Sequence, residues 1–151
     1  MLKVLVAVDD SPYSDAIIQM LSAEMRPADT TLRLLHVADP FPTRRAQAKG
    51  SKEYPDYETA RHEQYEEARQ LLTSAAARLE AAGFSTEWTV HEGDARGEIL
   101  DEAQAWGADL IVLGSHGRSG LKRLLTGSVS DAVVHHAACS VEIVRVIHAA
   151  H

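Results

Sequence analysis

The sequence contains 151 residues, 45% of them hydrophobic and 25% charged, which is ordinary for a soluble globular protein, and we expect a single domain over residues 1–151. Its formal net charge of −7 opposes nucleic-acid phosphates, so no nucleic-acid partner is expected. Its apolar runs are far shorter than the roughly 20 residues that cross a bilayer, so no membrane partner is expected.

Strand and helix patterns alternate in the N-terminal part of the chain. The almost continuously apolar segment 2–8 predicts a strand buried on both faces. Ser11 suits the N-cap of a helix over residues 12–25, whose first residue is a proline. A second strand is predicted over residues 31–37. The segment 43–52 lies among prolines and a glycine and shows no periodicity, so we predict a long mobile loop there.

The same alternation continues to the end of the chain, with glycines as the predicted helix stops. The remaining predicted elements are a helix over residues 57–82, a strand over 84–91, a helix between Asp94 and Gly107, a strand over 109–113, a helix from Ser128 to about Ala137, and a strand over 141–147. Ser128 and Asp131 have the spacing of a capping box, so Ser128 is the predicted N-cap of its helix.

These elements predict an α/β fold with a five-stranded parallel sheet, helices on both of its faces and right-handed crossovers. With the strand order 3-2-1-4-5, the order reverses between strands one and four, and ligands of such sheets lie beyond the carboxyl ends of the strands at that point. Asp9 ends the first strand and Gly114 follows the fourth. We therefore expect these two residues to lie near each other at a ligand site.

A glycine motif follows the fourth strand. Gly114-Ser115-His116-Gly117 is separated by nine residues from Gly127-Ser128. A strand that leads through glycines to a helix N-terminus lets backbone N–H groups approach an anion with no Cβ in the way, and the helix dipole favours negative charge. The spacing matches neither the Walker A motif nor the dinucleotide fingerprint. It nevertheless predicts a phosphate site.

Basic residues accompany this motif. Between Gly114 and Ser130 the charged residues are Arg118, Lys122 and Arg123, and no acid occurs there. Charge-assisted hydrogen bonds to phosphate are the stronger class, so we expect Arg118 to contact phosphate. Solvent exposure is an equal alternative for the other two.

At these positions the sequence resembles the universal stress protein family, in its nucleotide-binding branch. The residues that carry the resemblance are Val8-Asp9-Asp10-Ser11, Leu35-His36-Val37 and the spaced glycine motif. It covers essentially the whole chain. It implies a flavodoxin-like or Rossmann-like domain that binds an adenosine nucleotide, ATP in particular, with Mg²⁺ carried by the phosphates, and that takes part in stress survival, usually as a homodimer.

The resemblance also assigns roles to individual residues. It implies Asp9 as the acidic residue near the adenosine, Val37 as a backbone contact of the adenine, Leu113 and Gly114 beside the ribose, and Gly117, Gly127 and Ser128 around the phosphates. Asp10 departs from the family pattern, in which many members carry a smaller or uncharged residue. A second carboxylate that pointed into the pocket would repel phosphate.

Other interpretations of the same residues remain open. Asp9 could serve only to cap the first helix, and His135 with Cys139 has a metal-like spacing but no third ligand. Ser115, Ser128 and Ser130 are possible phosphate acceptors, yet no activating base is visible, so we expect at most slow ATP hydrolysis or weak autophosphorylation. The alternative functions are an adenylating or ATP-pyrophosphate-cleaving enzyme, whose loop after the first strand is missing, and a dimerisation module with a vestigial pocket.

The C-terminal strand predicts the mode of assembly. Val141 to Ile147 is strongly apolar and lies at an edge of the predicted sheet, where an unprotected strand tends to pair with another chain. We expect a homodimer through this strand.

The N-terminus lacks the features of a signal peptide, and the single cysteine, Cys139, agrees with a reducing compartment, so a cytoplasmic location is expected.

Overall fold

The structure is a computed structural model, and it describes residues 1–48, 50, 56–115 and 127–146. Its elements are, in chain order, β1 (Leu2–Ala7), α1 (Pro12–Glu24), the 3₁₀ turn η1 (Pro27–Asp29), β2 (Thr30–Ala38), α2 (Pro42–Ala48), α3 (Tyr57–Ala81), β3 (Ser85–Glu92), α4 (Ala95–Trp106), β4 (Leu110–Gly114), α5 (Ser128–His136) and β5 (Ser140–Val144). Within these ranges, none of the helices has the length and apolar character that a membrane span needs.

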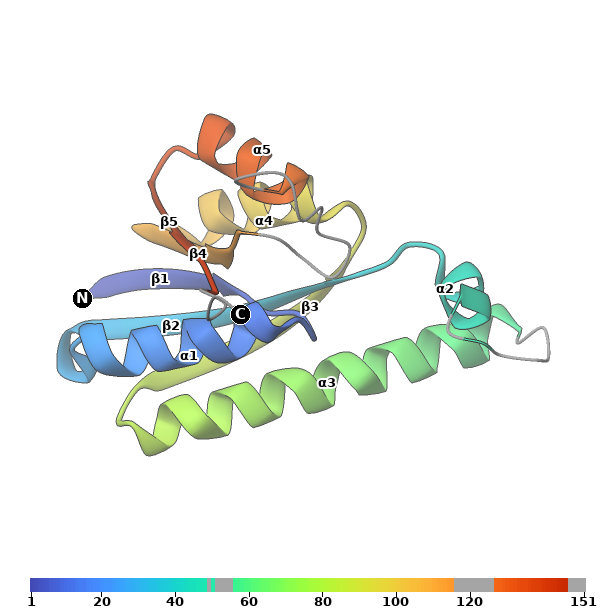
Figure 1. Cartoon of the computed structure of the whole chain (residues 1–151), viewed down its shortest axis with the longest axis horizontal. Coiled ribbons are helices and arrows are strands. Elements are labelled where there is room, and N and C mark those ends of the chain that lie inside the picture. Colours follow the sequence, from blue (N-terminus) through green and yellow to red (C-terminus); the bar gives the residue numbers. More distant parts are fainter. Residues whose placement is uncertain (49, 51–55, 116–126, 147–151) are drawn as a thin grey trace, which may run out of the picture.

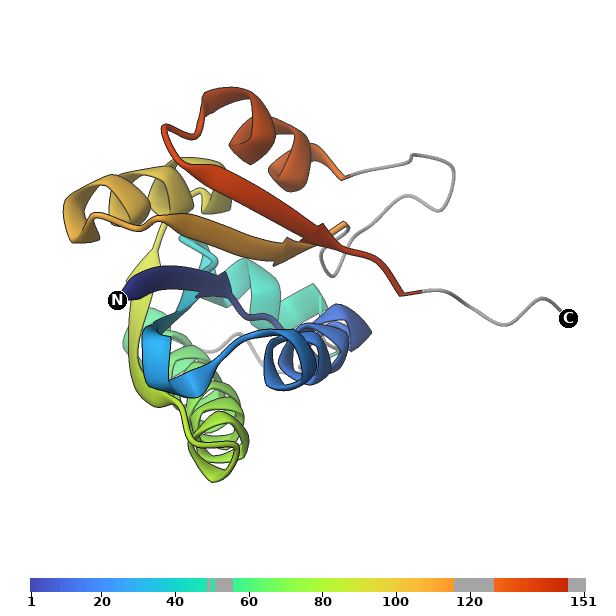
Figure 2. The same cartoon turned by 90° about the vertical axis from the view of Figure 1, so that its left-hand side faces the viewer.

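The strands form one parallel sheet in the order β3-β2-β1-β4-β5, which confirms the predicted order (Figure 1). Helices α1 and α3 lie on one face of the sheet, and α4 and α5 lie on the other (Figure 2). Each face has its own hydrophobic core. Because side chains of a strand alternate between the two faces, β1 contributes Val4 and Val6 to one core and Leu5 to the other.

The segment predicted as a mobile loop contains a helix instead. Residues 42–48 form α2, which packs against α3 (Figure 1). The carboxylate of Asp39 accepts the N–H of Phe41 at 2.8 Å, and Pro42 then supplies a backbone φ that suits the first turn of a helix. Arg, Ala and Gln are good helix formers, and so short a helix needs no long apolar periodicity. The prediction of a loop was wrong for this reason.

Helices α3 and α4 begin and end close to their predicted positions. At the N-cap of α3, Asp56 accepts hydrogen bonds from the N–H of Thr59 at 2.8 Å and from its hydroxyl at 3.1 Å, and these bonds lower the pKa of the Asp56 carboxyl. After α3, Gly83 has a φ of +98°, a left-handed conformation that glycine adopts without strain. Gly107, with a φ of +76°, ends α4 in the same way.

Two predictions at the C-terminal end need correction. The N-cap of α5 is Gly127, which has no side chain to cap the helix, so Ser128 is its first helical residue and not its cap. Strand β5 covers Ser140–Val144, which is shorter than the predicted range 141–147, and Ile147 lies outside the described residues. The strand ends there because its neighbour β4 ends at Gly114, which is paired with Val144.

Candidate functional site

The predicted site residues converge on the carboxyl edge of the sheet. Strand β1 lies between β2 and β4, and it ends after Ala7, which is paired with Leu35. Asp9 therefore follows β1 at the edge where β2 continues through Val37 and where β4 ends in Leu113 and Gly114. The structure brings these four residues to one edge. Gly117 and Arg118 lie outside the described residues.

Asp9 organises the turn between β1 and α1. Its Oδ1 accepts the N–H of Ser11 at 2.9 Å and lies 3.3 Å from the hydroxyl of Ser14. That hydroxyl donates to the Asp9 carbonyl at 2.6 Å and accepts the Asp9 N–H at 3.0 Å. In the described part of the chain all of these carboxylate contacts use Oδ1. Both interpretations of Asp9 are therefore compatible, because Oδ1 shapes the turn and Oδ2 remains for a ligand.

The neighbours of Asp9 differ from what a simple cap predicts. Ser11 occupies the N-cap position of α1, but its side chain makes no capping hydrogen bond, and its buried Oγ has no hydrogen-bond partner among the described residues. Asp10 is exposed to solvent.

His36 was not among the predicted site residues, and its Nδ1 lies 2.8 Å from the carbonyl oxygen of Val8. Because a carbonyl only accepts, Nδ1 carries the proton, and this bond ties the end of β1 to β2.

The backbone of Val37 faces the space beyond β1. The Leu35 carbonyl accepts the N–H of Val8 at 2.8 Å on the β1 side, and the Ala38 carbonyl accepts the N–H of Gly93 at 3.0 Å on the β3 side. Since peptide groups of alternate residues in a parallel strand point to the same neighbour, the groups of Val37 point to the β1 side. Strand β1 has already ended there. The side chain of Val37 packs into the core under α4 and α5.

The end of β4 is joined to the start of α5. The Ser115 N–H donates to the Val144 carbonyl at 2.9 Å, and the Ser115 carbonyl accepts the N–H of Gly127. Ser130 Oγ lies 2.9 Å from the same carbonyl. Gly127 therefore begins α5 directly beside the end of β4. The first N–H groups of a helix have no partner among its own carbonyl groups. Among the described residues, the N-cap Gly127 offers these groups no side-chain hydrogen bond, so they are candidate donors to an anion.

The three serines that were possible phosphate acceptors differ in exposure. Ser115 and Ser130 are only 3% and 2% exposed, whereas Ser128 is exposed to solvent. A buried hydroxyl that is hydrogen bonded to carbonyl groups cannot reach a phosphate without opening the structure. Among the three, Ser128 alone has the exposure that a phosphate acceptor needs.

A pocket lies at the carboxyl ends of β2 and β3, apart from the residues described above. It has a volume of about 360 Å³ and is lined by α3 and by the last residues of β2 and β3. One pair of its charged groups is joined: Arg61 Nε donates to Glu92 at 3.0 Å, and that hydrogen bond raises the pKa of the guanidinium. The pocket does not include Asp9 or the start of α5. It is therefore separate from the residues that the sequence predicts for the phosphate site.

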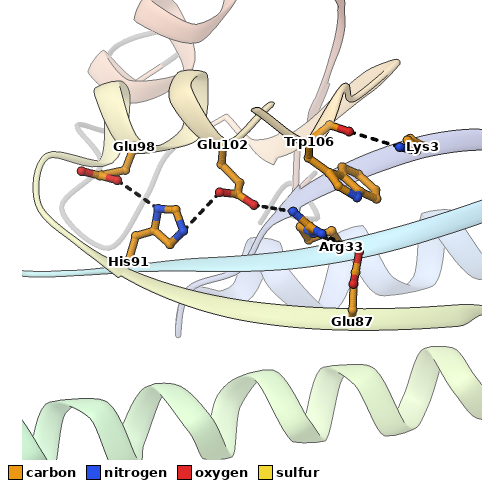
Figure 3. A network of polar contacts seen from close by, with 7 residues as sticks. All are labelled: Lys3, Arg33, Glu87, His91, Glu98, Glu102 and Trp106. Carbon is orange, nitrogen blue, oxygen red and sulfur yellow. Dashed lines mark hydrogen bonds and ion pairs between the residues drawn. The ribbon is translucent and has the colours of Figure 1, made fainter. Parts of the chain in front are cut away.

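A network of charged side chains holds α4 against β2 and β3 (Figure 3). Arg33 Nη1 lies 2.7 Å from Glu102 Oε1, and its Nη2 lies 2.9 Å from Glu87. The two ring nitrogens of His91 face Glu98 at 3.0 Å and Glu102 at 3.2 Å. The Arg33 guanidinium also lies 4.6 Å from the centre of the Trp106 ring. The sequence analysis did not predict this network, because its members are far apart in sequence.

Comparison with known proteins places the chain in a family. The family model of the universal stress protein family matches residues 1–145. The chain is 37% identical to universal stress protein A homolog 2 of Coxiella burnetii over 145 residues, which are 95% of this chain and 94% of that protein. A 45% identity to universal stress protein Sll1388 of Synechocystis spans 83 residues, so it covers about half of that relative, 54% of its length.

Solved structures agree with the fold. The structure of MJ0577, a universal stress protein of Methanocaldococcus jannaschii, is similar with a TM-score of 0.80 and 25% identity, and 97% of each chain is covered. A universal stress protein family member from Arabidopsis thaliana with AMP bound has a TM-score of 0.63 and 23% identity, over 96% of this chain and 92% of that one. From the family match over residues 1–145 and the relative that aligns over nearly its full length, the chain belongs to the universal stress protein family.

Proposed function

We propose that this chain is an adenosine-nucleotide-binding module of stress response or signalling, and that it binds ATP at the carboxyl edge of the sheet between β1 and β4. The observation that carries the proposal is that the Asp9 turn and the start of α5, with its glycine N-cap, lie at the same edge of the sheet. A carboxylate on one side and backbone N–H groups on the other match the polarity of a nucleotide, whose base and ribose donate hydrogen bonds and whose phosphates accept them.

Different residues of the edge contact different parts of the nucleotide. Asp9 Oδ2 and the backbone groups of Val37 are available for the adenosine, because Oδ1 is engaged in the turn and β1 has ended beside Val37. Leu113 and Gly114 lie beside the ribose. Gly127 and Ser128 receive the phosphates at the N-terminus of α5, with Gly117 and Arg118 as further contacts, and Mg²⁺ binds through the phosphate oxygens.

The fold relationship adds support from a protein with a known ligand. The Arabidopsis family member contains AMP and shares the fold of this chain. ATP hydrolysis is at most slow under this proposal, because the described edge supplies charge stabilisation but no base positioned to activate a nucleophile.

Nucleotide identification and selectivity test the function. We expect denatured protein, purified without added nucleotide, to release an adenosine nucleotide that mass spectrometry identifies. We also expect calorimetric titration to show ATP binding at least about tenfold tighter than GTP binding, a difference of about 1.4 kcal/mol. Equal affinity for the two nucleotides would remove the adenine contacts from the proposal, and the absence of any nucleotide binding would refute it.

The proposed assembly is a homodimer through β5. This strand lies at the edge of the sheet and pairs only with β4 among the described strands. Its Val141 and Ile143 side chains pack into the core under α4 and α5, and Val144 packs into the opposite core. These side chains are partly buried in the protomer, and a partner strand would pair with the backbone of the outer edge.

A backbone substitution tests this dimer. The Val144 carbonyl accepts a hydrogen bond from the β4 side, so the N–H of Ile143 points to the outer edge, because peptide groups alternate along a strand. Ile143→Pro removes that donor, whereas Ile143→Ala shortens the side chain and keeps it. We expect light scattering to find Ile143→Pro monomeric and Ile143→Ala dimeric. A monomeric parent, or a dimer that both variants leave intact, would contradict the assignment to β5.

A further inference from the structure

The hydroxyl of Ser130 joins the two parts of the glycine motif, Ser115 in the first part and Gly127 in the second. Ser130 lies in the first turn of α5 and is only 2% exposed. Its Oγ is 2.9 Å from the carbonyl oxygen of Ser115 and 3.0 Å from that of Gly127. The contact with Gly127 is local, because serine hydroxyls in helices often bond to a carbonyl three residues earlier. The contact with Ser115 is not local, since fifteen positions separate the two residues.

The chemistry of these contacts fixes their direction. A carbonyl oxygen only accepts, so Ser130 is the donor in both contacts and shares its single hydrogen between the two oxygens. The Ser115 carbonyl is in a buried residue and also accepts the Gly127 N–H. Through the Ser115 N–H, which donates to Val144, the same point is anchored to β5. The start of α5 is thus held to the end of β4 by backbone groups and by the side chain of Ser130.

We propose that Ser130 is a positioning residue for phosphate binding. Its hydroxyl fixes Gly127 and the first N–H groups of α5 relative to Ser115 at the end of β4, and it does not contact the ligand. This inference rests on the proposed nucleotide function and deepens it, because it names the side chain that sets the geometry of the phosphate end of the site. Ser130 is buried and its hydroxyl donates to two carbonyl groups, so it does not have the exposure that a phosphate acceptor needs.

The adenosine end of the site does not depend on this contact. Asp9 is held by Ser11 and Ser14, and Val37 is held within the sheet. Loss of the Ser130 hydroxyl should therefore weaken binding of the phosphates and spare binding of the nucleoside. A comparison of ATP with adenosine separates these two contributions, whereas general loss of structure would reduce both.

The test uses three substitutions at this position and one elsewhere. Ser130→Ala removes the donor, Ser130→Thr keeps it, and Ser130→Cys fills the space with a weak donor. The control is Ser22→Ala on α1, because the Ser22 hydroxyl donates to the Ile18 carbonyl of its own helix, at 2.8 Å, and joins no second element within the described residues. Circular dichroism and thermal melting establish that each variant is folded. Calorimetric titration then measures the Kd of ATP with Mg²⁺ and the Kd of adenosine.

We expect Ser130→Ala to raise the Kd of ATP about tenfold and to change the Kd of adenosine less than about twofold, while Ser130→Thr and Ser22→Ala bind ATP as the parent does. If Ser130→Ala does not fold, Ser130→Cys should show the same selective loss. If the parent binds ATP but Ser130→Ala loses affinity for ATP and adenosine equally, or keeps its affinity for ATP, the role of Ser130 is overturned and the proposed function stands. A parent that binds neither compound would overturn the proposed function and this inference with it.

Discussion

Two polar regions of the molecule are built in opposite ways. At the carboxyl edge between β1 and β4, the groups proposed to face a ligand are mostly backbone groups, and the side chains of Asp9, Ser14 and Ser130 hold that backbone. In the network beneath α4, side chains contact other side chains directly, and Glu102 lies against both Arg33 and His91 (Figure 3). The first region presents backbone groups at the edge of the sheet, and the second pairs charged side chains with one another.

This difference separates binding from stability. Under the proposed function, the first N–H groups of α5, which follow a glycine N-cap, receive the anion. The paired charges of the network, with the Glu102 side chain only 11% exposed, have little capacity left for a ligand. We therefore expect substitutions in the network to change the free energy of unfolding, and substitutions at the edge to change nucleotide affinity.

The largest expected effect is on stability. Glu102→Ala leaves Arg33 and His91 each without one of their two carboxylate partners. Because Glu102 is largely buried whereas Arg33 is partly exposed, we expect the free energy of unfolding to fall by about 1–3 kcal/mol in urea titrations, below the loss for fully buried pairs. The Kd of ATP should stay within about twofold of the parent value.

A matched control for this substitution is Glu66→Ala on α3. Glu66 pairs with Arg69 at 3.1 Å, and the two side chains are 38% and 44% exposed. Solvent screens such a pair, so its loss should change stability by less than about 0.5 kcal/mol. If Glu102→Ala also weakened ATP binding about tenfold, the two regions would be energetically coupled and the contrast between them would fail.

The next effect is on affinity. Gly127 has φ −81° and ψ 170°, an extended conformation that valine adopts without strain, so Gly127→Val should fold and keep the N–H bond to Ser115. Its branched side chain would crowd the N-terminus of α5 and weaken ATP binding at least about tenfold, or about 1.4 kcal/mol. The check is the rise in melting temperature on adding ATP, which the variant should largely lose. A parent-like rise in the folded variant would exclude Gly127 from the phosphate site.

The two regions also differ in how far the sequence predicts them. The strand order is an assumption of the sequence analysis that the structure confirms. The two strand ends that form the edge between β1 and β4 follow from local patterns, because a strand followed by Asp9 or Gly114 carries its own signal in consecutive residues. The network has no such signal. Arg33 and Glu102 lie 69 positions apart and meet only after β2 and α4 have packed together. No spacing rule links residues at that separation, so the sequence alone could not identify the pair.

Local rules also fail where tertiary contacts decide between close alternatives. Ser128 fits a capping box, but the tie from Gly127 and Ser130 to Ser115 moves the start of α5 so that Gly127 becomes the N-cap. Helix α2 forms from a stretch without apolar periodicity because α3 is there to pack against it. In both cases a distant partner, which sequence patterns do not specify, selects the local conformation.

The smallest expected effect concerns Asp9 and separates its two roles. Asp9→Ala would remove the acceptor of the Ser11 N–H and disturb the turn, so a loss of binding would be ambiguous. Asp9→Asn keeps one oxygen that can accept this N–H, removes the negative charge and puts an NH2 donor in the place of the acceptor Oδ2. If Oδ2 accepts a hydrogen bond from the nucleoside, the variant should keep the stability of the parent to within about 0.5 kcal/mol and bind adenosine and ATP about threefold more weakly, by a similar factor for both. Titration of both compounds measures this, and a loss confined to ATP would place Asp9 near the phosphates instead. Unchanged affinity for both would assign Asp9 to the turn alone, and the adenosine would then rest on the backbone of Val37.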